Sequence, residues 1–395
     1  MKKQLRNRKA GSFLLVLGFS LGFAHTTSAQ FRRNPVVSPE IHADNKVTFR
    51  VYAPKANEIT LSGDWMGFGK SEPLIKGDTG LWAVTIGPLE PELYGYNFTV
   101  DGVYTLDASN ALVKRDGVRN ISFFMIRGKG SDLYEPKHGT KGMLSKVWYE
   151  SPTLGLTRRM YVYTPPGYEN NSKETYPVFY LLHGGGGDED AWTELGLTPT
   201  IMDNLINSGQ AKPMIVVMTN GNPDQSAAGI EAPAKLPGQE VPGPFGMANK
   251  KFEQSLVKDV VPYIESHYRV KKGKENRALS GLSMGGWQTL NTTFDNPDMF
   301  DYICVMSMGF VKDSPFGLPN NGEGRGKDID ALKKANPKVY WIACGKDDFL
   351  YDSVVNLRNT LDEHGFKYKY VESTGGHTWT NWRIYLSQFA PVLFK

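Results

Sequence analysis

The feature that most constrains the fold is a serine set between two glycines, where a predicted strand gives way to a predicted helix. The stretch reads Gly281-Leu282-Ser283-Met284-Gly285 and follows a short strand-like run over residues 277–280. A side chain at either glycine would collide with the neighbouring strand or helix. The turn would hold the serine in a strained backbone conformation that exposes its hydroxyl. It would also place the next backbone N–H at a helix N-terminus, where it can donate to an oxyanion. A lone match also fits an ordinary turn, so the interpretation depends on the rest of the chain.

From residue 143 onward, short apolar runs alternate with amphipathic stretches. The predicted strands are 160–163, 178–182, 214–218, 278–280, 302–306, 339–343 and 368–371. The helix predicted over residues 250–267 places Phe252, Leu256 and Val260 on one stripe. Continuous apolar strands between such helices predict a parallel sheet covered on both faces. Residues 223–247 interrupt the pattern with an irregular insertion, which fits either a binding loop or a plain surface loop.

Two polar loops follow Ser283 at the ends of consecutive predicted strands. One contains Asp347 and Asp348, and the other contains His377 between Gly376 and Thr378. Ligands bind at this edge of open α/β sheets. Of the seven histidines, His377 is the one that stands on such a loop after the acids, so we expect it to be the general base. Asp348, three residues after the glycine that ends its strand, is the expected acid, whereas Asp347 and Asp352 are more simply solvated or helix-capping carboxylates.

A glycine-rich loop upstream is the candidate for the second oxyanion donor. The sequence Leu182-His183-Gly184-Gly185-Gly186-Gly187 follows the third strand of the domain, where a loop of the H-G-G-G type would lie. Gly185 can offer its N–H opposite that of Met284, and His183 is expected to be a structural hydrogen-bonder. The loop lacks the Gly-Lys-Ser/Thr ending of a phosphate loop and dinucleotide spacing. With no H-E-x-x-H or cysteine pair either, we expect no cofactor and no metal.

Taken together, residues 143–395 resemble carbohydrate esterase family 1, the feruloyl and acetylxylan esterases. The matching motifs are Tyr161–Tyr168, the glycine-rich loop with Trp192 beyond it, Gly281–Gly286, the acid loop at 344–348 and Gly-Gly-His-x-Trp at 375–379. The resemblance implies an α/β-hydrolase fold and hydrolysis of ester side groups on feruloylated or acetylated xylan. It implies that Ser283 attacks the ester, His377 relays the proton and Asp348 holds the imidazolium.

The chain before this domain has a different pattern. Residues 30–128 predict a separate domain, in which residues 46–127 show period-two strands and Asp101-Gly102 predicts a hairpin with a type I′ turn. Gly63-Asp64-Trp65, Gly80-Leu81-Trp82 and Asp107-Ala108-Ser109-Asn110 resemble early-Set domains like carbohydrate-binding module 48, with Ala108 departing from the usual proline. The resemblance implies a small immunoglobulin-like sandwich. Its aromatic residues fit either a sugar-stacking platform or a core, and the candidates are Trp65, Trp82, Tyr94 and Tyr96. Residues 129–142, rich in glycine and lysine, predict a linker.

The first 29 residues predict a cleaved secretory signal. Basic residues from Lys2 to Lys9 precede the apolar run 13–24, which is too short to span a bilayer, and Thr27-Ser28-Ala29 fits a cleavage site. The prediction is a secreted or periplasmic protein without a membrane anchor. Removing the segment takes away five basic and no acidic side chains, which changes the net charge from +4 to −1 and leaves no reason to expect nucleic acid. Cys304 and Cys344 stand in apolar strands and predict buried free thiols. No sequence feature specifies an oligomeric state.

The acyl group is predicted from the aromatic residues near the expected site. Trp379, Phe310 and Phe316 are the candidate substrate-binding residues, since a feruloyl ring needs apolar walls and an acetyl group needs only a small slot. The sequence thus favours a feruloyl esterase. The alternatives are an acetylxylan esterase, an enterochelin-esterase-like siderophore hydrolase, and a secreted glycan-binding protein without catalysis, against which the intact Ser283, Asp348 and His377 argue.

Overall fold

The computed structural model describes residues 36–395, apart from positions 68, 118, 171–172, 224–248 and 313–319. Within it, Val37–Lys395 form one compact unit. The predicted signal segment lies outside the described residues, as do Phe316 and nearly all of the insertion expected at 223–247. Along the part of the chain that is described, no helix is long and apolar enough to cross a membrane.

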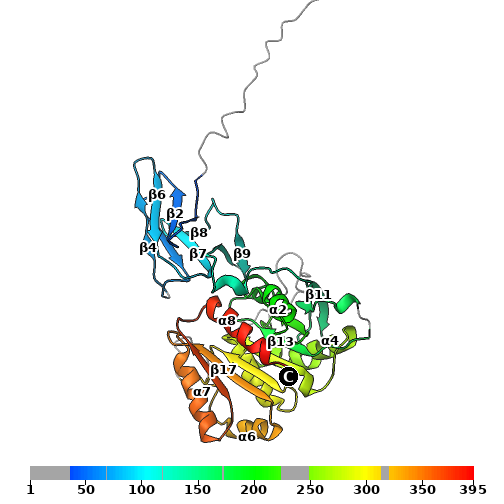
Figure 1. The fold of residues 1–395 in the computed structure, drawn as a ribbon. Coiled ribbons are helices and arrows are strands. Elements are labelled where there is room, and N and C mark those ends of the chain that lie inside the picture. The colour runs from blue at the N-terminus through cyan, green and yellow to red at the C-terminus, as the bar shows by residue number, and fades with distance from the viewer. Residues whose placement is uncertain (1–35, 68, 118, 171–172, 224–248, 313–319) are drawn as a thin grey trace, which may run out of the picture. The chain divides into compact units, whose positions relative to one another are not determined.

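The leading domain is an antiparallel β-sandwich, as its period-two pattern predicts (Figure 1). One sheet has the order β1 (Glu40–Ile41), β2 (Val47–Tyr52), β6 (Leu81–Ile86) and β5 (Ile75–Lys76). The other has the order β4 (Glu72–Pro73), β3 (Ile59–Gly63), β7 (Leu93–Val100), β10 (Arg119–Met125) and β9 (Val113–Asp116), with β8 (Val103–Thr105) paired to β7. Between β7 and β8, Asp101 and Gly102 have φ values of 47° and 83°, the positive pair that the predicted type I′ turn requires.

The candidate sugar-binding aromatics of this domain form its core. Trp82, Tyr94 and Tyr96 are 6%, 8% and 1% exposed. The ring of Trp65 packs 5.7 Å from that of Phe124. Because Trp82, Tyr94 and Tyr96 are buried and the partly buried Trp65 packs against the same cluster, these rings stabilise the core of the sandwich.

The segment at 129–142 is not a flexible linker, which corrects the expectation from its composition. Tyr134 within it is 2% exposed and belongs to a hydrophobic cluster that includes residues of both domains. Asn204 of the second domain donates hydrogen bonds of 3.2 and 3.0 Å to the carbonyl oxygens of Leu133 and Glu135. Since side chains of the second domain satisfy its backbone, the segment is an ordered part of the fold.

The second domain contains a sheet of eight strands within the described residues (Figure 1). The order is β11 (Met143–Ser151), β12 (Leu156–Thr164), β14 (Ile215–Thr219), β13 (Val178–Leu182), β15 (Arg277–Leu282), β16 (Tyr302–Met306), β17 (Val339–Gly345) and β18 (Lys369–Ser373). Strands β13 to β18 pair in parallel, as predicted. Strands β11 and β12 form an antiparallel edge, which the sequence did not predict; a short turn joins them, so no crossover helix is needed. The predicted fold class, an α/β-hydrolase domain preceded by an all-β sandwich, is confirmed.

Helices cover both faces of this sheet. They are α1 (Ala191–Glu194), α2 (Thr198–Asn207), α3 (Lys251–Ser255), α4 (Val261–His267), α5 (Met284–Asp295), α6 (Gly326–Ala335), α7 (Tyr351–Glu363) and α8 (Trp379–Phe389). The shorter turns are η2 (Ser131–Leu133), η3 (Tyr168–Asn170), η6 (Leu256–Val260), η7 (Lys274–Asn276) and η8 (Ala390–Val392). Residues of α3 to α7 pack in one cluster and residues of α1, α2 and α8 in another. The sheet is therefore the middle of three layers.

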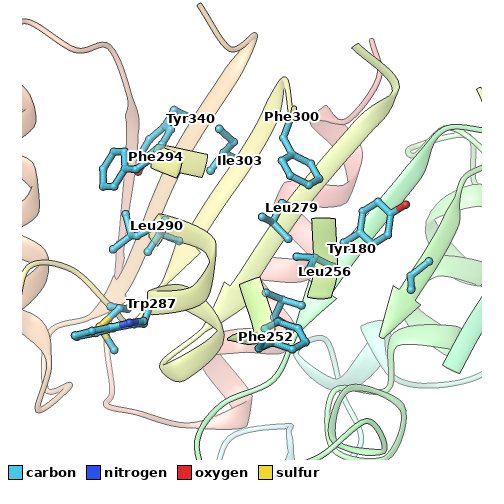
Figure 2. Close-up of a cluster of buried hydrophobic side chains, with 14 of the residues drawn as sticks. Tyr180, Phe252, Leu256, Leu279, Trp287, Leu290, Phe294, Phe300, Ile303 and Tyr340 are labelled. Atoms are coloured by element: carbon cyan, nitrogen blue, oxygen red, sulfur yellow. The ribbon is translucent and has the colours of Figure 1, made fainter. Parts of the chain in front are cut away.

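The two clusters explain why the sequence of β13 is apolar at every position. Tyr180 and Leu182 belong to the cluster with α3 to α7, whereas Phe179 and Leu181 belong to the other. Figure 2 shows Tyr180 in the first cluster, to which helix side chains such as Leu256 and Phe252 also belong. Because successive side chains of a strand point to opposite faces, a strand covered on both sides is apolar at every position.

The helix predicted over residues 250–267 forms as α3, η6 and α4. Phe252, Leu256 and Val260 are buried, as the predicted stripe requires. The middle segment η6 is a π-helical turn, in which Asp259 accepts hydrogen bonds from the hydroxyls of Ser151 and Thr153 at 2.5 and 2.9 Å. This widened turn is a local feature that apolar periodicity does not encode.

The two cysteines are free and buried, as predicted. Cys304 lies on β16 and Cys344 on β17, both fully shielded from water. Burial raises the pKa of the Cys304 thiol to about 12. Both thiols therefore act as small apolar side chains of the core.

Candidate active site

The serine of the G-x-S-x-G stretch stands on a strained turn between β15 and α5. Ser283 has φ 53° and ψ −116°, an unfavourable region for a residue with a side chain. A Cβ on Gly281 would overlap the carbonyl oxygen of Gly285, and one on Gly285 would lie 2.6 Å from the carbonyl oxygen of Leu182. Both glycines are thus required for helix and strand to approach, and the backbone of Ser283 is fixed by a 2.9 Å hydrogen bond from its N–H to Met306 O. The site has the geometry of a nucleophile elbow.

Asp348 and His377 are hydrogen-bonded to each other at the carboxyl edge of the sheet. Asp348 follows β17 and His377 follows β18. The Nδ1 of His377 lies 2.9 Å from each carboxylate oxygen of Asp348, whose side chain is fully shielded from water, while that of His377 is 17% exposed. Asp347 is exposed. Of the neighbouring acids, Asp348 is therefore the one that contacts the imidazole, in agreement with the spacing argument.

The backbone around Asp348 orients its carboxylate. The N–H of Leu350 donates to Asp348 Oδ1 at 2.9 Å. The N–H of Asp347 donates to Gly375 O at 3.0 Å, and this bond ties the acid loop to the loop that carries His377. The His377 ring also makes a T-shaped contact with the ring of Trp382, with 4.9 Å between ring centroids. The imidazole is thereby held between a carboxylate and a fixed indole, so its orientation is set before any substrate binds.

The glycine-rich loop after β13 lies beside Ser283. Its turn is closed by the N–H of Gly187 donating to Gly184 O at 3.3 Å, and Gly186 has a φ of 82°, which favours glycine there. A Cβ on Gly184 would lie 3.4 Å from the Cβ of Ser283, and one on Gly185 would meet no described atom within 4 Å. The predicted donor Gly185 thus borders open space next to the serine.

The buried side chain of His183 stabilises this loop through hydrogen bonds. It is 1% exposed, its Nε2 accepts the N–H of Gly221 at 2.8 Å, and its Nδ1 donates to Gly184 O at 2.7 Å. Burial lowers the pKa of the His183 imidazole, so the ring is neutral and one nitrogen can accept while the other donates. The structural role predicted for His183 is confirmed.

The predicted substrate-binding residues have different surroundings. Trp379 is half-buried, and its ring packs 5.2 Å from Trp192 and 5.1 Å from Trp382. Phe310 is 2% exposed, and its ring lies 6.2 Å from that of Phe294 in the core. The prediction that Phe310 lines a substrate pocket is therefore wrong: its ring is already removed from water on the covered face of the sheet.

One aromatic residue near His377 was missed by the sequence analysis. Phe349 is 52% exposed, and its ring centroid lies 4.4 Å from that of His377. A large apolar side chain that is half exposed beside a histidine–carboxylate pair is unusual for packing alone. The signal available in the sequence was its place directly after Asp348, on a loop at the edge where ligands bind.

The described residues contain no cluster of three or more histidine, cysteine, aspartate or glutamate side chains that could hold a metal ion. The chemistry that these residues can perform directly is nucleophilic. A strained serine, a histidine oriented by a carboxylate and backbone donors at a helix N-terminus are the parts that acyl transfer needs.

Comparison with known families agrees with this chemistry. The family model described as "Putative esterase" matches residues 151–392, which is more than half of the chain. The chain belongs to this esterase family. Membership of this family supports ester hydrolysis as the chemistry of residues 151–392. A second model, carbohydrate-binding module 48 (isoamylase N-terminal domain), matches residues 36–113, which include the sandwich up to the start of β9.

Two relatives illustrate the range of activities among similar proteins. An endo-1,4-β-xylanase/feruloyl esterase of Xylanibacter ruminicola is 30% identical over 370 residues, covering 90% of this chain and 46% of the relative. An acetyl esterase of Caldicellulosiruptor saccharolyticus is 28% identical over 163 residues, covering 34% of this chain and 61% of the relative. The chain thus spans about half the length of these curated relatives.

Solved structures resemble the fold as well. A CE1 ferulic acid esterase of Anaeromyces mucronatus, solved with ferulic acid, has a TM-score of 0.58 and 26% identity, covering 67% of this chain and 95% of that chain. An enterobactin esterase of Shigella flexneri has a TM-score of 0.66 and 14% identity, covering 88% of this chain and 93% of that chain, which shows a shared fold alone. The predicted resemblance to carbohydrate esterase family 1, with a leading domain like carbohydrate-binding module 48, is confirmed.

Proposed function

We propose that the protein is a secreted serine esterase that releases hydroxycinnamoyl groups, feruloyl above all, from xylan. The observation that carries the proposal is the combination of Ser283 at positive φ with His377 hydrogen-bonded to the buried carboxylate of Asp348. A structural serine or histidine has no need of either arrangement.

The proposed reaction follows the triad scheme. The Oγ of Ser283 attacks the ester carbonyl carbon while its proton passes to Nε2 of His377, and Asp348 stabilises the imidazolium. The N–H groups of Gly185 and Met284 donate to the oxyanion. The tetrahedral intermediate then collapses and the bond to the sugar oxygen breaks. That oxygen takes the proton from His377 and leaves as the sugar hydroxyl, so that an acyl-enzyme remains. Water repeats the sequence, so that the free acid and the original serine are restored.

Aromatic side chains near the base favour a feruloyl group over an acetyl group. Phe349 is exposed beside His377, and Trp379 is half-buried two residues after it. A planar phenolic ring that leaves water against such walls gains roughly 1.5–3 kcal/mol. An acetyl group is too small to use them, so we expect feruloyl esters to be preferred by about tenfold or more in kcat/KM. The feruloyl esterase named among the relatives supports this substrate class.

The location and the polymeric substrate are part of the same proposal. The segment 1–29 has the composition of a cleaved signal, and it would direct the enzyme to where plant polysaccharide is found. The leading domain matches a carbohydrate-binding module model, which supports a polysaccharide substrate.

A release assay tests the proposal. The full-length enzyme is offered feruloylated arabinoxylan, acetylated xylan and a siderophore trilactone side by side, and ferulate, acetate and monomeric siderophore are measured. We expect ferulate release to be fastest. Preferential release of acetate would favour an acetylxylan esterase, and cleavage of the trilactone alone would favour the siderophore hydrolase, whose fold this chain shares.

A further inference from the structure

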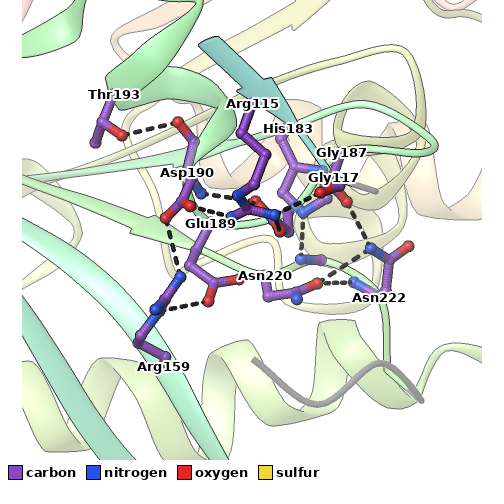
Figure 3. A network of polar contacts seen from close by, with 12 residues as sticks. Arg115, Gly117, Arg159, His183, Gly187, Glu189, Asp190, Thr193, Asn220 and Asn222 are labelled. Atoms are coloured by element: carbon purple, nitrogen blue, oxygen red, sulfur yellow. Dashed lines mark hydrogen bonds and ion pairs between the residues drawn. The ribbon is translucent and has the colours of Figure 1, made fainter. Parts of the chain in front are cut away.

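The β9–β10 hairpin of the sandwich lies against the glycine-rich loop that follows β13 (Figure 3). Gly117 at the hairpin turn has a φ of 58°, and a Cβ there would overlap the carbonyl oxygen of Gly186. A Cβ on Gly187 would lie 3.3 Å from a carboxylate oxygen of Asp116. The loop that carries Gly185 is therefore in contact with the leading domain as well as with its own.

The glycine-rich loop continues into three acidic residues, and two arginines compensate them. Arg159 on β12 pairs with Glu189 at 2.7 Å and with Asp190 at 3.0 Å. Arg115 on β9 contacts the two carboxylate oxygens of Asp188 at 2.5 and 3.0 Å and also pairs with Asp190 (Figure 3). Consecutive like charges repel one another, most strongly where water is excluded. The leading domain thus supplies Arg115, one of the cations among the described residues that neutralise this stretch.

Asp188 depends on Arg115 more than its neighbours do. Its side chain is fully shielded from water, and one of its oxygens also accepts the N–H of Asp190 at 3.0 Å. Among the described residues, the cation paired with Asp188 is Arg115. A buried carboxylate that loses its cation is strongly destabilised. Without Arg115, conformations that bring Asp188 into water would be favoured over the present one.

A change in the conformation of Asp188 would alter the conformation of the neighbouring glycines. Asp188 directly follows the turn that the Gly184–Gly187 hydrogen bond closes. Other anchors of the loop come from the second domain: Asn222 Nδ2 donates to Gly187 O at 2.9 Å, and His183 accepts from Gly221. They fix the loop before Asp188, and Arg159 holds Glu189 and Asp190 after it. At Asp188 itself, the position next to the glycines, the cation among the described residues is Arg115.

We propose that Arg115 is a positioning residue for ester hydrolysis. Through it, the leading domain supplies the charge that keeps the loop in the conformation that presents the N–H of Gly185 to the oxyanion. The inference rests on the proposed function insofar as it takes this loop to be the oxyanion loop. The sandwich would then contribute to catalysis through Arg115, in addition to any role in binding glycan.

The test uses full-length Arg115→Met with p-nitrophenyl acetate. Because the oxyanion donor is misplaced and not deleted, we expect kcat to fall by about tenfold or more while KM changes by less than about threefold. Affinity for an arylboronic acid, which forms a tetrahedral adduct with a serine, should fall in parallel with kcat. Arg115→Lys should retain part of the activity, since lysine keeps the positive charge but cannot make the bidentate contact with the Asp188 carboxylate. The double variant Arg115→Met with Asp188→Asn should recover part of the loss, because it removes the unpaired charge.

Two matched controls separate positioning from simple destabilisation. Lys114→Met removes a neighbouring interdomain ion pair, with Glu194 at 3.4 Å, and Arg50→Met removes a pair within the sandwich, with Glu40 at 2.6 Å. Both should keep wild-type kcat. The proposal is overturned if Arg115→Met keeps wild-type kcat, if Lys114→Met loses as much, or if activity falls while boronate affinity is unchanged. Since p-nitrophenyl acetate requires no feruloyl pocket, failure of the feruloyl assignment would leave this test valid.

Discussion

Replacing Asp348 by asparagine tests the assignment of the acid most sharply. The carboxylate now accepts from His377 Nδ1 with both oxygens at 2.9 Å, and the N–H of Leu350 donates to Oδ1. In the variant, the Leu350 N–H favours the amide oxygen at the Oδ1 position. The amide nitrogen then replaces Oδ2 and presents an N–H to Nδ1. This arrangement favours the tautomer of His377 that carries its proton on Nε2, which cannot accept a proton from Ser283.

The expected loss is large because nothing can substitute for the carboxylate. Its side chain has no exposed surface, so water cannot replace the missing acceptor or stabilise an imidazolium. We expect kcat to fall by about 10⁴-fold, as wrong-tautomer variants of this triad do. At 1.36 kcal/mol per decade, that loss corresponds to about 5.5 kcal/mol of transition-state stabilisation.

The assay is steady-state hydrolysis of methyl ferulate by Asp348→Asn, with thermal melting to verify the fold. Asp347→Asn is the matched control, since Asp347 is the adjacent residue in the same loop and is exposed. We expect the control to stay within about twofold of wild-type kcat. A larger loss for Asp347→Asn than for Asp348→Asn, or a loss below about tenfold for Asp348→Asn, would refute the reasoning.

Three further predictions follow from the same structure. Ser283→Ala and His377→Ala should each lower kcat by about 10⁴–10⁶-fold with unchanged circular dichroism, because triad members act as a unit; a loss of less than about 10³-fold in either variant would contradict the assignment. Phe349→Ala should lower kcat/KM for methyl ferulate by about tenfold and for p-nitrophenyl acetate by less than about threefold, whereas an equal loss on both esters would show that Phe349 supports His377 and not the acyl ring. Burial raises the pKa of Glu253 from 4.5 to about 7, so the folded state keeps a proton that the unfolded chain releases, and stability falls as pH rises from 4.5 to 7. Glu253→Gln should therefore raise the free energy of unfolding at pH 8 by about 2–3 kcal/mol, and an equal gain at pH 4 in chemical denaturation would contradict this account.

The parts of the site that sequence predicts are those fixed by local structure. A serine between two glycines after a strand can adopt few backbone conformations, so the turn at Ser283 follows from five residues. The carboxyl ends of parallel strands share one edge, so Asp348 and His377 come together once their strands are identified. The spacing from Gly345 then distinguishes Asp348 from Asp347, and the hydrogen bonds to His377 agree.

The parts that sequence does not predict depend on contacts between distant segments. Phe310 follows a strand and precedes a stretch with proline, glycine and asparagine, which suggested an exposed loop, yet it packs on Phe294 of α5. The segment 129–142 is glycine-rich, yet side chains of α2 bind its backbone. The pair of Arg115 and Asp188 joins residues 73 positions apart. In each case tertiary packing decides the outcome, and local composition carries no signal of it.

The most direct test of the central claim is the release of ferulate from feruloylated arabinoxylan by the wild-type protein and by Ser283→Ala. We predict that the wild-type protein releases ferulate faster than it releases acetate from acetylated xylan, and that Ser283→Ala releases both at least about 10⁴-fold more slowly than the wild-type protein. Ferulate release that persists in Ser283→Ala would contradict the assigned nucleophile. A wild-type protein that releases no ferulate, but cleaves an acetyl ester or a siderophore trilactone, would contradict the assigned substrate.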